Sequence, residues 1–279
     1  MLPGELERRV SAKKALQKHV PVLEHAFALA VDLFDKFVRL PFPPEEPRVQ
    51  TVLSGILFQA IYRLRAATLL CEDALSHEAE IMLRSLFETK LATRFILLPG
   101  LRTDWQNGLP KAFPPIPSDR TAVGFRADLY SCSETIRLDR LTDKLAGDPI
   151  LNDAATAAIV EQPKRRMADV EKLIGPEWIA CIRKSKTYSG MRVSELATYC
   201  GSGEYYLKVY GHQSSKVHAA TALTFLQPAD LSVLGDIFVM GIALLGEVLD
   251  DFNRAFAMNL KGPFEHLVER LQKLMKRSN

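Results

Sequence analysis

Apolar residues recur along most of this chain at intervals of three and four positions, the spacing that gathers them on one face of an α-helix. Strict alternation of apolar and polar residues, which is typical of β-strands, is almost absent. The first segments predicted to be helical are 5–19 and 23–40, with a break or kink at Pro21, and 48–74. The hydrophobic pattern therefore predicts an all-α protein.

Proline and glycine punctuate this pattern. The run LPFPPEEP (40–47) cannot continue a helix and predicts a linker. Ser76 has the residue type and position of an N-cap, and its helix is expected to end at residue 98, before Pro99 and Gly100. Further helices are expected at 118–145 (capped by Ser118), 148–173 (interrupted by Pro163), 178–184, 194–199, 205–225, 229–258 and 263–276. The predicted fold is a multi-helix bundle with one long Pro-rich loop at about 99–118.

This segmentation also gives a domain hypothesis. Residues 1–47 are expected to form an N-terminal helical pair and linker, and residues 48–279 a bundle domain that carries the site. Three glycines in the most apolar segment, Gly235, Gly241 and Gly246, predict close approach by neighbouring helices.

Composition narrows the class of protein only slightly. The chain has 279 residues, of which 47% are hydrophobic and 25% charged, as expected of a globular protein. A net charge of +3 permits contact with nucleic acid or anionic ligands without arguing for either. The four cysteines are dispersed without metal-ligand spacing, which predicts reduced core thiols in a cytoplasmic protein. We expect no metal and no cofactor.

One segment, 231–249, has the length of a membrane span. It contains Asp236 and Glu247, so a buried core helix is the better interpretation, and no membrane partner is expected. The N-terminal residues are charged and lack the apolar stretch of a signal peptide.

The strongest candidate for a functional site lies in the segment 205–225. Tyr210, Ser214 and His218 are spaced four apart, which places them on one side of a helix. The same side is expected to carry Leu207, so we predict that the three polar groups point inward. Buried polar groups need hydrogen-bond partners, because an unpaired one costs about 1–3 kcal/mol.

Arg84 and Glu88 are the predicted partners. They are also four residues apart, and apolar residues flank them on the helical wheel, whereas Lys90 and Arg94 are expected to mark the solvent side. Arg65, on the preceding helix, is a further candidate for the same pocket, with a simple surface role as its alternative. For the whole cluster, the alternative to a ligand or catalytic site is a structural polar knot that fixes helix register.

These motifs resemble a bacterial helical family known as domain of unknown function 5677. The resemblance covers about residues 52–247 and rests on short motifs: R-S-L-F-E, a following R-V-S-E-L-A, a tyrosine pair and Y-x-x-x-S-x-x-x-H. The matching residues are Arg84, Ser85, Glu88, Ser194, Leu196, Ala197, Tyr206, Tyr210, Ser214 and His218. The resemblance implies an all-α fold and a polar constellation, without an established reaction.

Some families of this kind look similar to the HEPN group of metal-independent ribonuclease and nucleotide-binding domains, which are common in bacterial defence and toxin systems. The hallmark of that group is an arginine four to six residues before a histidine on one helix, and no histidine of this chain has one. A composite pair, Arg84 from one helix and His218 from another, has the required chemistry.

Two hypotheses follow from the sequence. The first is a HEPN-like ribonuclease or nucleotide-binding protein with His218 as acid or base, Arg84 as electrostatic stabiliser, Glu88 orienting Arg84, and Tyr210 and Ser214 donating hydrogen bonds. The second is a non-catalytic helical module that binds a partner protein or a second copy of itself. The motifs of P-loop, Rossmann, α/β-hydrolase and H-E-x-x-H zinc enzymes are absent from the sequence.

Overall fold

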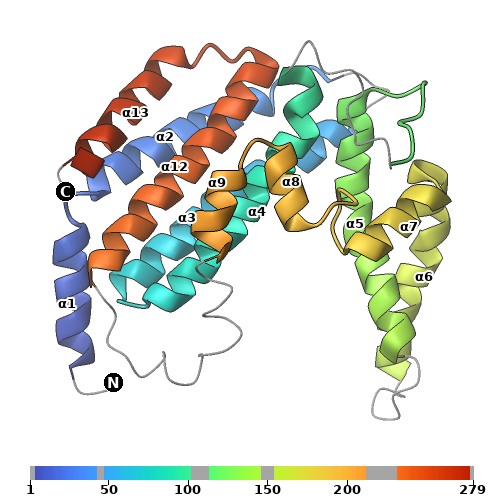
Figure 1. Cartoon of the computed structure of the whole chain (residues 1–279), viewed down its shortest axis with the longest axis horizontal. Helices are drawn as coiled ribbons and strands as arrows, with labels where there is room; N and C mark the ends of the chain where they lie inside the picture. The colour runs from blue at the N-terminus through green and yellow to red at the C-terminus, as the bar shows by residue number, and fades with distance from the viewer. Residues whose placement is uncertain (1–3, 43–46, 102–112, 146–153, 212–230, 277–279) are drawn as a thin grey trace. The chain divides into compact units, whose positions relative to one another are not determined.

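The computed structural model describes residues 4–42, 47–101, 113–145, 154–211 and 231–276. Helices and their connecting turns account for these residues, and no β-strand occurs among them (Figure 1). The predicted all-α class is therefore confirmed.

Most helices follow the predicted segments closely. Their bounds are α1 Glu5–Leu16, α2 Val20–Phe37, α3 Pro47–Glu72, α4 Ser76–Leu101, α5 Ala122–Leu145, α6 Ala154–Ile174, α7 Pro176–Ser185, α8 Val193–Tyr199, α9 Gly203–Tyr205, η2 Tyr206–Gly211, α12 Leu231–Phe256 and α13 Lys261–Lys276.

Three expected breaks fall differently in the structure. Pro99 lies inside α4, which continues to Leu101, and Pro163 lies inside α6, so the expected Pro-rich loop does not begin at residue 99. Pro99 has no N–H to donate to the Phe95 carbonyl four residues earlier, and this carbonyl instead accepts a hydrogen bond from Arg126 Nη1 at 2.8 Å, so it stays paired where α4 passes Pro99. The helix expected to start at Ser118 begins instead at Ala122, where the Thr121 hydroxyl accepts a hydrogen bond from the Gly124 N–H at 3.0 Å.

The chain divides into two compact units whose boundaries differ from the expected one at residue 47. The first unit comprises residues 1–41, 54–94 and 202–279, and the second comprises residues 42–53 and 95–201. Helices α3 and α4 therefore contribute residues to both units.

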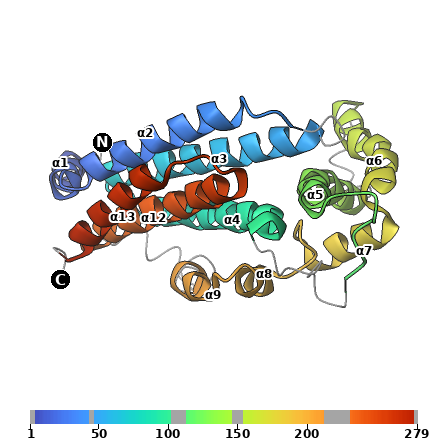
Figure 2. The same cartoon turned by 90° about the horizontal axis from the view of Figure 1, so that it is seen from above.

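The core of the first unit forms around α12, which packs against α1, α2 and α13 (Figures 1 and 2). Gly241 lets α12 approach its other neighbours, because a Cβ added there would lie 2.7 Å from Leu64 Cδ1 of α3 and 3.7 Å from Leu83 Cδ1 of α4. The prediction that this glycine admits close neighbours is confirmed. Aromatic packing adds to the core, with Phe37 meeting Phe252 edge to face at 5.1 Å.

In the second unit, α5 packs against α6 and α7. Arg126 is fully buried here, and it donates hydrogen bonds to the Phe95 carbonyl at 2.8 Å and to the Tyr199 hydroxyl at 2.9 Å. A buried guanidinium is tolerated only when such partners replace water.

No helix among the described residues combines the length and apolar character needed to cross a membrane. Residues 231–249, which have the length of a membrane span, belong to α12. Four residues of this helix, Leu244, Leu245, Val248 and Leu249, are fully buried in the first unit. All four cysteines are free thiols, and Cys71, Cys132 and Cys200 are buried as predicted. Burial raises the pKa of the Cys71 thiol to about 12.

Candidate functional site

Arg84, Glu88 and Tyr210 lie together in the first unit, as the sequence predicted. Arg84 Nη2 donates a hydrogen bond to the Tyr210 hydroxyl at 2.6 Å, and that hydroxyl donates in turn to Glu88 Oε1, also at 2.6 Å. Arg84 Nε and Glu88 Oε1 form an ion pair at 3.5 Å, one helical turn apart on α4. We call these three residues the tyrosine cluster.

The tyrosine cluster is half-buried and stacked. The Arg84 guanidinium carbon lies 3.8 Å from the centroid of the Tyr210 ring, and that ring stacks on Tyr206 with centroids 5.1 Å apart and planes 17° apart. Cation–π and aromatic stacking thus add to the hydrogen bonds. Arg84 and Glu88 keep 26% and 45% of their side-chain surface exposed, so the cluster remains open to solvent and to ligands.

A π-helix presents Tyr210 to α4. The six residues of η2 (Tyr206–Gly211) follow the short helix α9, and π-helical turns often occur at functional sites. A π-helical turn contains more residues than the 3.6 of an α-helix, so the predicted α-helical facing fails locally. Leu207, expected to point inward, is 70% exposed, whereas Val209 is buried.

The environment of Tyr210 keeps its phenol protonated. Burial raises the pKa of this phenol to about 12, and the hydrogen bond to Glu88 acts in the same direction. Tyr210 is therefore a hydrogen-bond donor at neutral pH. Arg84 has five N–H donors in a fixed fork, and within the described part of the chain its Nη1 group makes no hydrogen bond, so this edge can meet an anionic oxygen.

The tyrosine cluster accounts for three of the predicted site residues. Ser214 and His218 lie outside the described residues. Arg65 is exposed, and the structure places it in no hydrogen bond or ion pair with another described residue. Its neighbour Arg63 instead joins α3 to α4, donating hydrogen bonds to the Ser85 carbonyl at 2.8 Å and to the Thr89 hydroxyl.

Lys90 and Arg94 do not mark the solvent side of α4, and that expectation was wrong. Lys90 Nζ forms an ion pair with Glu247 Oε2 at 2.5 Å. The angle between the two groups does not suit a hydrogen bond. Arg94 donates from Nε and Nη2 to the two carboxylate oxygens of Asp251, each at 2.8 Å. The Lys90 side chain is 1% exposed and that of Asp251 is 0% exposed.

We call Lys90, Arg94, Glu247 and Asp251 the α4–α12 cluster. Tyr205 joins its edge, with Lys90 Nζ 4.3 Å from the ring centroid, and burial together with a hydrogen bond to Glu247 raises the pKa of Tyr205 to about 12. Desolvation lowers the pKa of Lys90 and raises that of Asp251. The sequence carried a signal for this cluster: Glu247 and Asp251 are four apart on a strongly apolar helix, as Lys90 and Arg94 are on α4.

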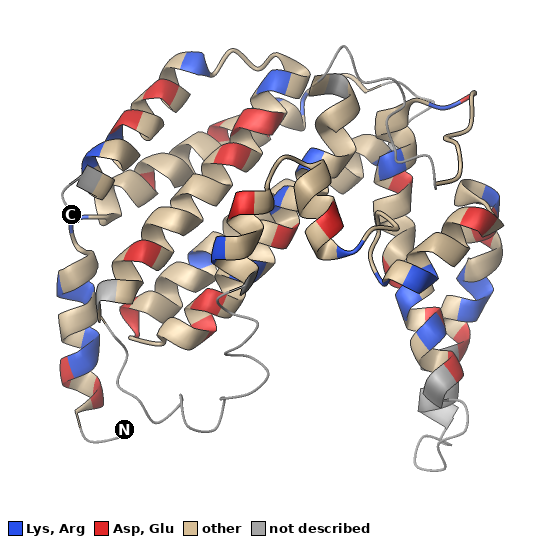
Figure 3. Ribbon diagram, in the orientation of Figure 1, with Lys and Arg blue, Asp and Glu red and all other residues tan. Residues whose placement is uncertain are grey.

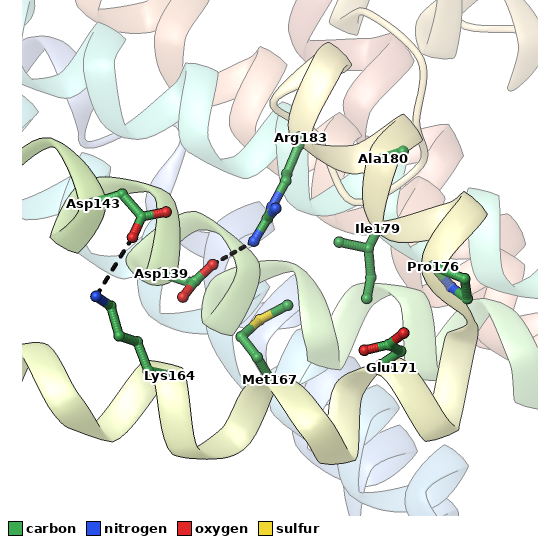
Figure 4. A pocket seen from close by; sticks show the side chains of 9 residues that line it. All are labelled: Asp139, Asp143, Lys164, Met167, Glu171, Pro176, Ile179, Ala180 and Arg183. Carbon is green, nitrogen blue, oxygen red and sulfur yellow. Dashed lines mark hydrogen bonds and ion pairs between the residues drawn. The ribbon is translucent and has the colours of Figure 1, made fainter.

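The second unit contains a separate cavity of about 600 Å³ between α5, α6 and α7 (Figure 4). Four of its five charged side chains are paired, Asp139 with Arg183 at 2.5 Å and Asp143 with Lys164 at 3.6 Å, and the fifth is Glu171. Lys164 belongs to the basic run 164–166, in which Arg165 also pairs, with Glu161 at 2.8 Å. This pairing agrees with a solvated surface role for the run and leaves the tyrosine cluster as the better candidate site.

Within the described ranges, no group of three or more His, Cys, Asp or Glu residues is arranged to hold a metal ion. Comparison of the chain with family models, with curated proteins and with solved structures finds no match.

Proposed function

We propose that this chain binds the phosphate of an RNA or a nucleotide at the tyrosine cluster and cleaves RNA without a metal ion. The observation that carries the proposal is the position of Arg84, a partly exposed guanidinium whose Nη2 donates to Tyr210. Tyr210 is four residues before Ser214 and eight before His218 along the chain. A cation and an imidazole are the two groups that phosphodiester chemistry requires.

In the proposed reaction, the ribose 2′-hydroxyl attacks the adjacent phosphorus and the P–O5′ bond breaks. His218 removes the proton of the 2′-hydroxyl, and a solvent proton is delivered to the departing 5′-oxygen. The products are a 2′,3′-cyclic phosphate and a 5′-hydroxyl. Arg84 stabilises the charge on the phosphoryl oxygens and Glu88 orients Arg84. Ser214 donates a hydrogen bond, and Tyr210 donates its single hydroxyl proton to the phosphate in place of Glu88.

A second candidate function is a non-catalytic helical module in which the tyrosine cluster is structural. It is favoured by the fact that the Tyr210 hydroxyl already uses its proton on Glu88 and a lone pair on Arg84. Glu88 also neutralises part of the positive charge that a phosphate would need. In this reading, the hydrogen bonds only hold α9 and η2 against α4.

Incubation of purified chain with total RNA, with and without EDTA, separates the two candidates. The ribonuclease proposal expects cleavage that EDTA does not inhibit, with products ending in a cyclic phosphate. His218→Ala and Arg84→Ala should each reduce the rate at least about a hundredfold while leaving the melting temperature within a few degrees.

Arg254→Ala is the matched control, because Arg254 is an exposed arginine in an i,i+4 ion pair of the same unit, with Asp250 at 3.8 Å. This variant should keep full activity. Absence of cleavage by the wild-type chain in both conditions, or unchanged rates in both site variants, overturns the ribonuclease and leaves the structural module.

A further inference from the structure

Helix α3 presents aromatic side chains to solvent. Phe58 and Tyr62 are 50% and 53% exposed, and their rings lie against each other with centroids 4.3 Å apart. Arg65 and Leu69 continue the same side at three- and four-residue intervals, both exposed. We call these four residues the α3 face. Two large rings held half in water are unusual enough to require a reason.

The α3 face adjoins the tyrosine cluster. The hydrogen bond from Arg63 Nη1 to the Ser85 carbonyl joins α3 to α4, and its two partners are the chain neighbours of Tyr62 and Arg84. On α4, Ile81 is also exposed one turn before Arg84 and Ser85. The aromatic stack of Phe58 with Tyr62 thus lies on α3, and the cation–aromatic stack uses Arg84 of α4, the helix that this hydrogen bond joins to α3.

The charge of α3 suits a polyanion. Helix α3 contains three arginines and one acidic residue, Glu72, at its last position. Arg48 pairs with Asp128 at 3.7 Å and Arg63 bonds to α4, so Arg65 is the arginine of α3 that has no partner among the described residues. Elsewhere in the described chain, acidic and basic residues are interspersed on most helices (Figure 3). An unpaired arginine beside exposed aromatic rings is the chemistry that holds single-stranded nucleic acid, in which bases stack on rings and cations meet the backbone.

We propose that the α3 face binds single-stranded RNA by stacking its bases on Phe58 and Tyr62, with Arg65 on a backbone phosphate. This inference rests on the proposed function, because it supplies the substrate path leading to Arg84. The face reads bases only by their flat surfaces, so it binds unpaired RNA with little sequence preference.

A second copy of the chain fits this face less well. A helix–helix seam built on Phe58, Tyr62 and Leu69 would bury Arg65 in its middle, whereas the acidic residue of α3, Glu72, lies at the end of the helix, seven residues away. Burying an uncompensated guanidinium is costly, whereas a phosphate group compensates it.

Fluorescence anisotropy with a labelled 12-nucleotide 2′-O-methyl RNA tests the proposal, since this probe has no free 2′-hydroxyl and survives cleavage. The full-length chain is titrated at low salt. Phe58→Ala and Tyr62→Ala should each weaken binding about tenfold, and Tyr62→Trp should preserve it. Arg65→Gln should weaken binding and lower the steepness of its salt dependence.

Leu69→Ala is the matched control, because Leu69 is 55% exposed on the same face and has no ring. It should change affinity less than about twofold. Circular dichroism of each variant confirms folding. Equal affinity of the Phe58, Tyr62 and Leu69 variants overturns the proposal, as does equally tight binding of duplex RNA. Loss of a dimer in sedimentation, with RNA affinity unchanged, assigns the face to a second copy instead.

The binding assay tests the α3 face and the cleavage assay tests the ribonuclease, so either proposal can be overturned without the other. RNA affinity that depends on Phe58 and Tyr62, without cleavage of any RNA, supports the α3 face and overturns the ribonuclease. Cleavage that depends on Arg84 and His218, with the same KM in the Phe58 and Tyr62 variants, supports the ribonuclease and overturns the α3 face.

Discussion

Helix α4 carries two ionic clusters that differ mainly in their distance from water. In the tyrosine cluster, Arg84 and Glu88 pair with each other and with Tyr210 while remaining partly exposed. In the α4–α12 cluster, Lys90 and Arg94 pair with carboxylates of α12, and Asp251 has no exposed surface. Similar side chains four residues apart thus produce two different physical situations.

Burial decides what each cluster can do. A buried ion pair has given up its hydration, so removal of one partner leaves a charge that nothing compensates. A half-exposed cluster exchanges partners with water at small cost, which allows a ligand to compete for the same groups. The α4–α12 cluster is therefore expected to govern stability, and the tyrosine cluster is free to serve binding.

The largest expected effect follows from Arg94→Met. This change leaves the buried carboxylate of Asp251 without its two hydrogen bonds, and the free energy of unfolding should fall by about 3–5 kcal/mol. Urea unfolding followed by circular dichroism measures the loss. Arg254→Met, which breaks an exposed pair with Asp250, should cost about 1 kcal/mol or less.

A double variant sharpens this result. Arg94→Met combined with Asp251→Leu removes both charges and should recover most of the stability, because no uncompensated group remains. Equal losses for Arg94→Met and Arg254→Met would contradict the distinction between the two clusters.

Tyr210→Phe should have a smaller effect. It removes the hydroxyl between Arg84 and Glu88, but both charged groups keep each other and water, so the free energy of unfolding should fall by about 1 kcal/mol. Tyr206→Phe retains the stacked ring and is the matched control in the same unfolding assay. A loss as large as that of Arg94→Met would show that the tyrosine cluster is as tightly built as the buried one.

Alkaline pH should lower the free energy of unfolding of the wild-type chain through ionisation of the Tyr210 phenol. The pKa of Tyr210 is raised to about 12 in the folded state, above the usual value of 10, so the folded state holds this proton more tightly than the unfolded state does. Its contribution is complete below pH 10 and is lost as the pH rises toward 12.

Tyr210→Phe should therefore lose less stability than the wild type between pH 10 and pH 11. The difference should be about 1 kcal/mol or less, because solvent reaches the cluster. Urea midpoints collected at pH 9, 10 and 11 for both proteins give the comparison. Parallel pH profiles would remove Tyr210 as the titrating group.

The smallest effect on stability is expected at Leu207. Along the chain this residue lies between Tyr205, at the edge of the α4–α12 cluster, and Tyr210 of the tyrosine cluster. Leu207→Ser should change the free energy of unfolding by no more than about 0.5 kcal/mol, since the side chain is exposed. Val209→Ser, at a buried position two residues later, should cost several times more. A reversed order would restore the α-helical facing of this segment.

The sequence predicted the helices well because helical periodicity is a local property. The segments around α1, α2, α3, α12 and α13 were recovered within a few residues. The pair Arg84 and Glu88 and its contact with Tyr210 were also predicted, since i,i+4 spacing and apolar flanks can be read from one helix at a time.

Other features depend on partners far along the chain or on unusual backbone geometry. Arg94 meets Asp251 across 157 positions, and a wheel drawn for α4 alone assigned this arginine to solvent because of its residue type. The π-helical turn at Tyr206–Gly211 leaves no mark in hydrophobic periodicity, so the side reached by Leu207 could not be foreseen.

Gly241 of α12 packs against α3, the helix that carries the candidate binding surface. Because Gly241 has no side chain, Leu64 of α3 can pack directly against the backbone of α12. Leu64 follows Arg63, whose guanidinium joins α3 to α4. A methyl group at position 241 would lie 2.7 Å from Leu64 Cδ1, so the end of the Leu64 side chain would have to shift. A single hydrogen atom in place of a methyl group therefore decides how closely α12 and the residue next to Arg63 can pack, at a point inside the core.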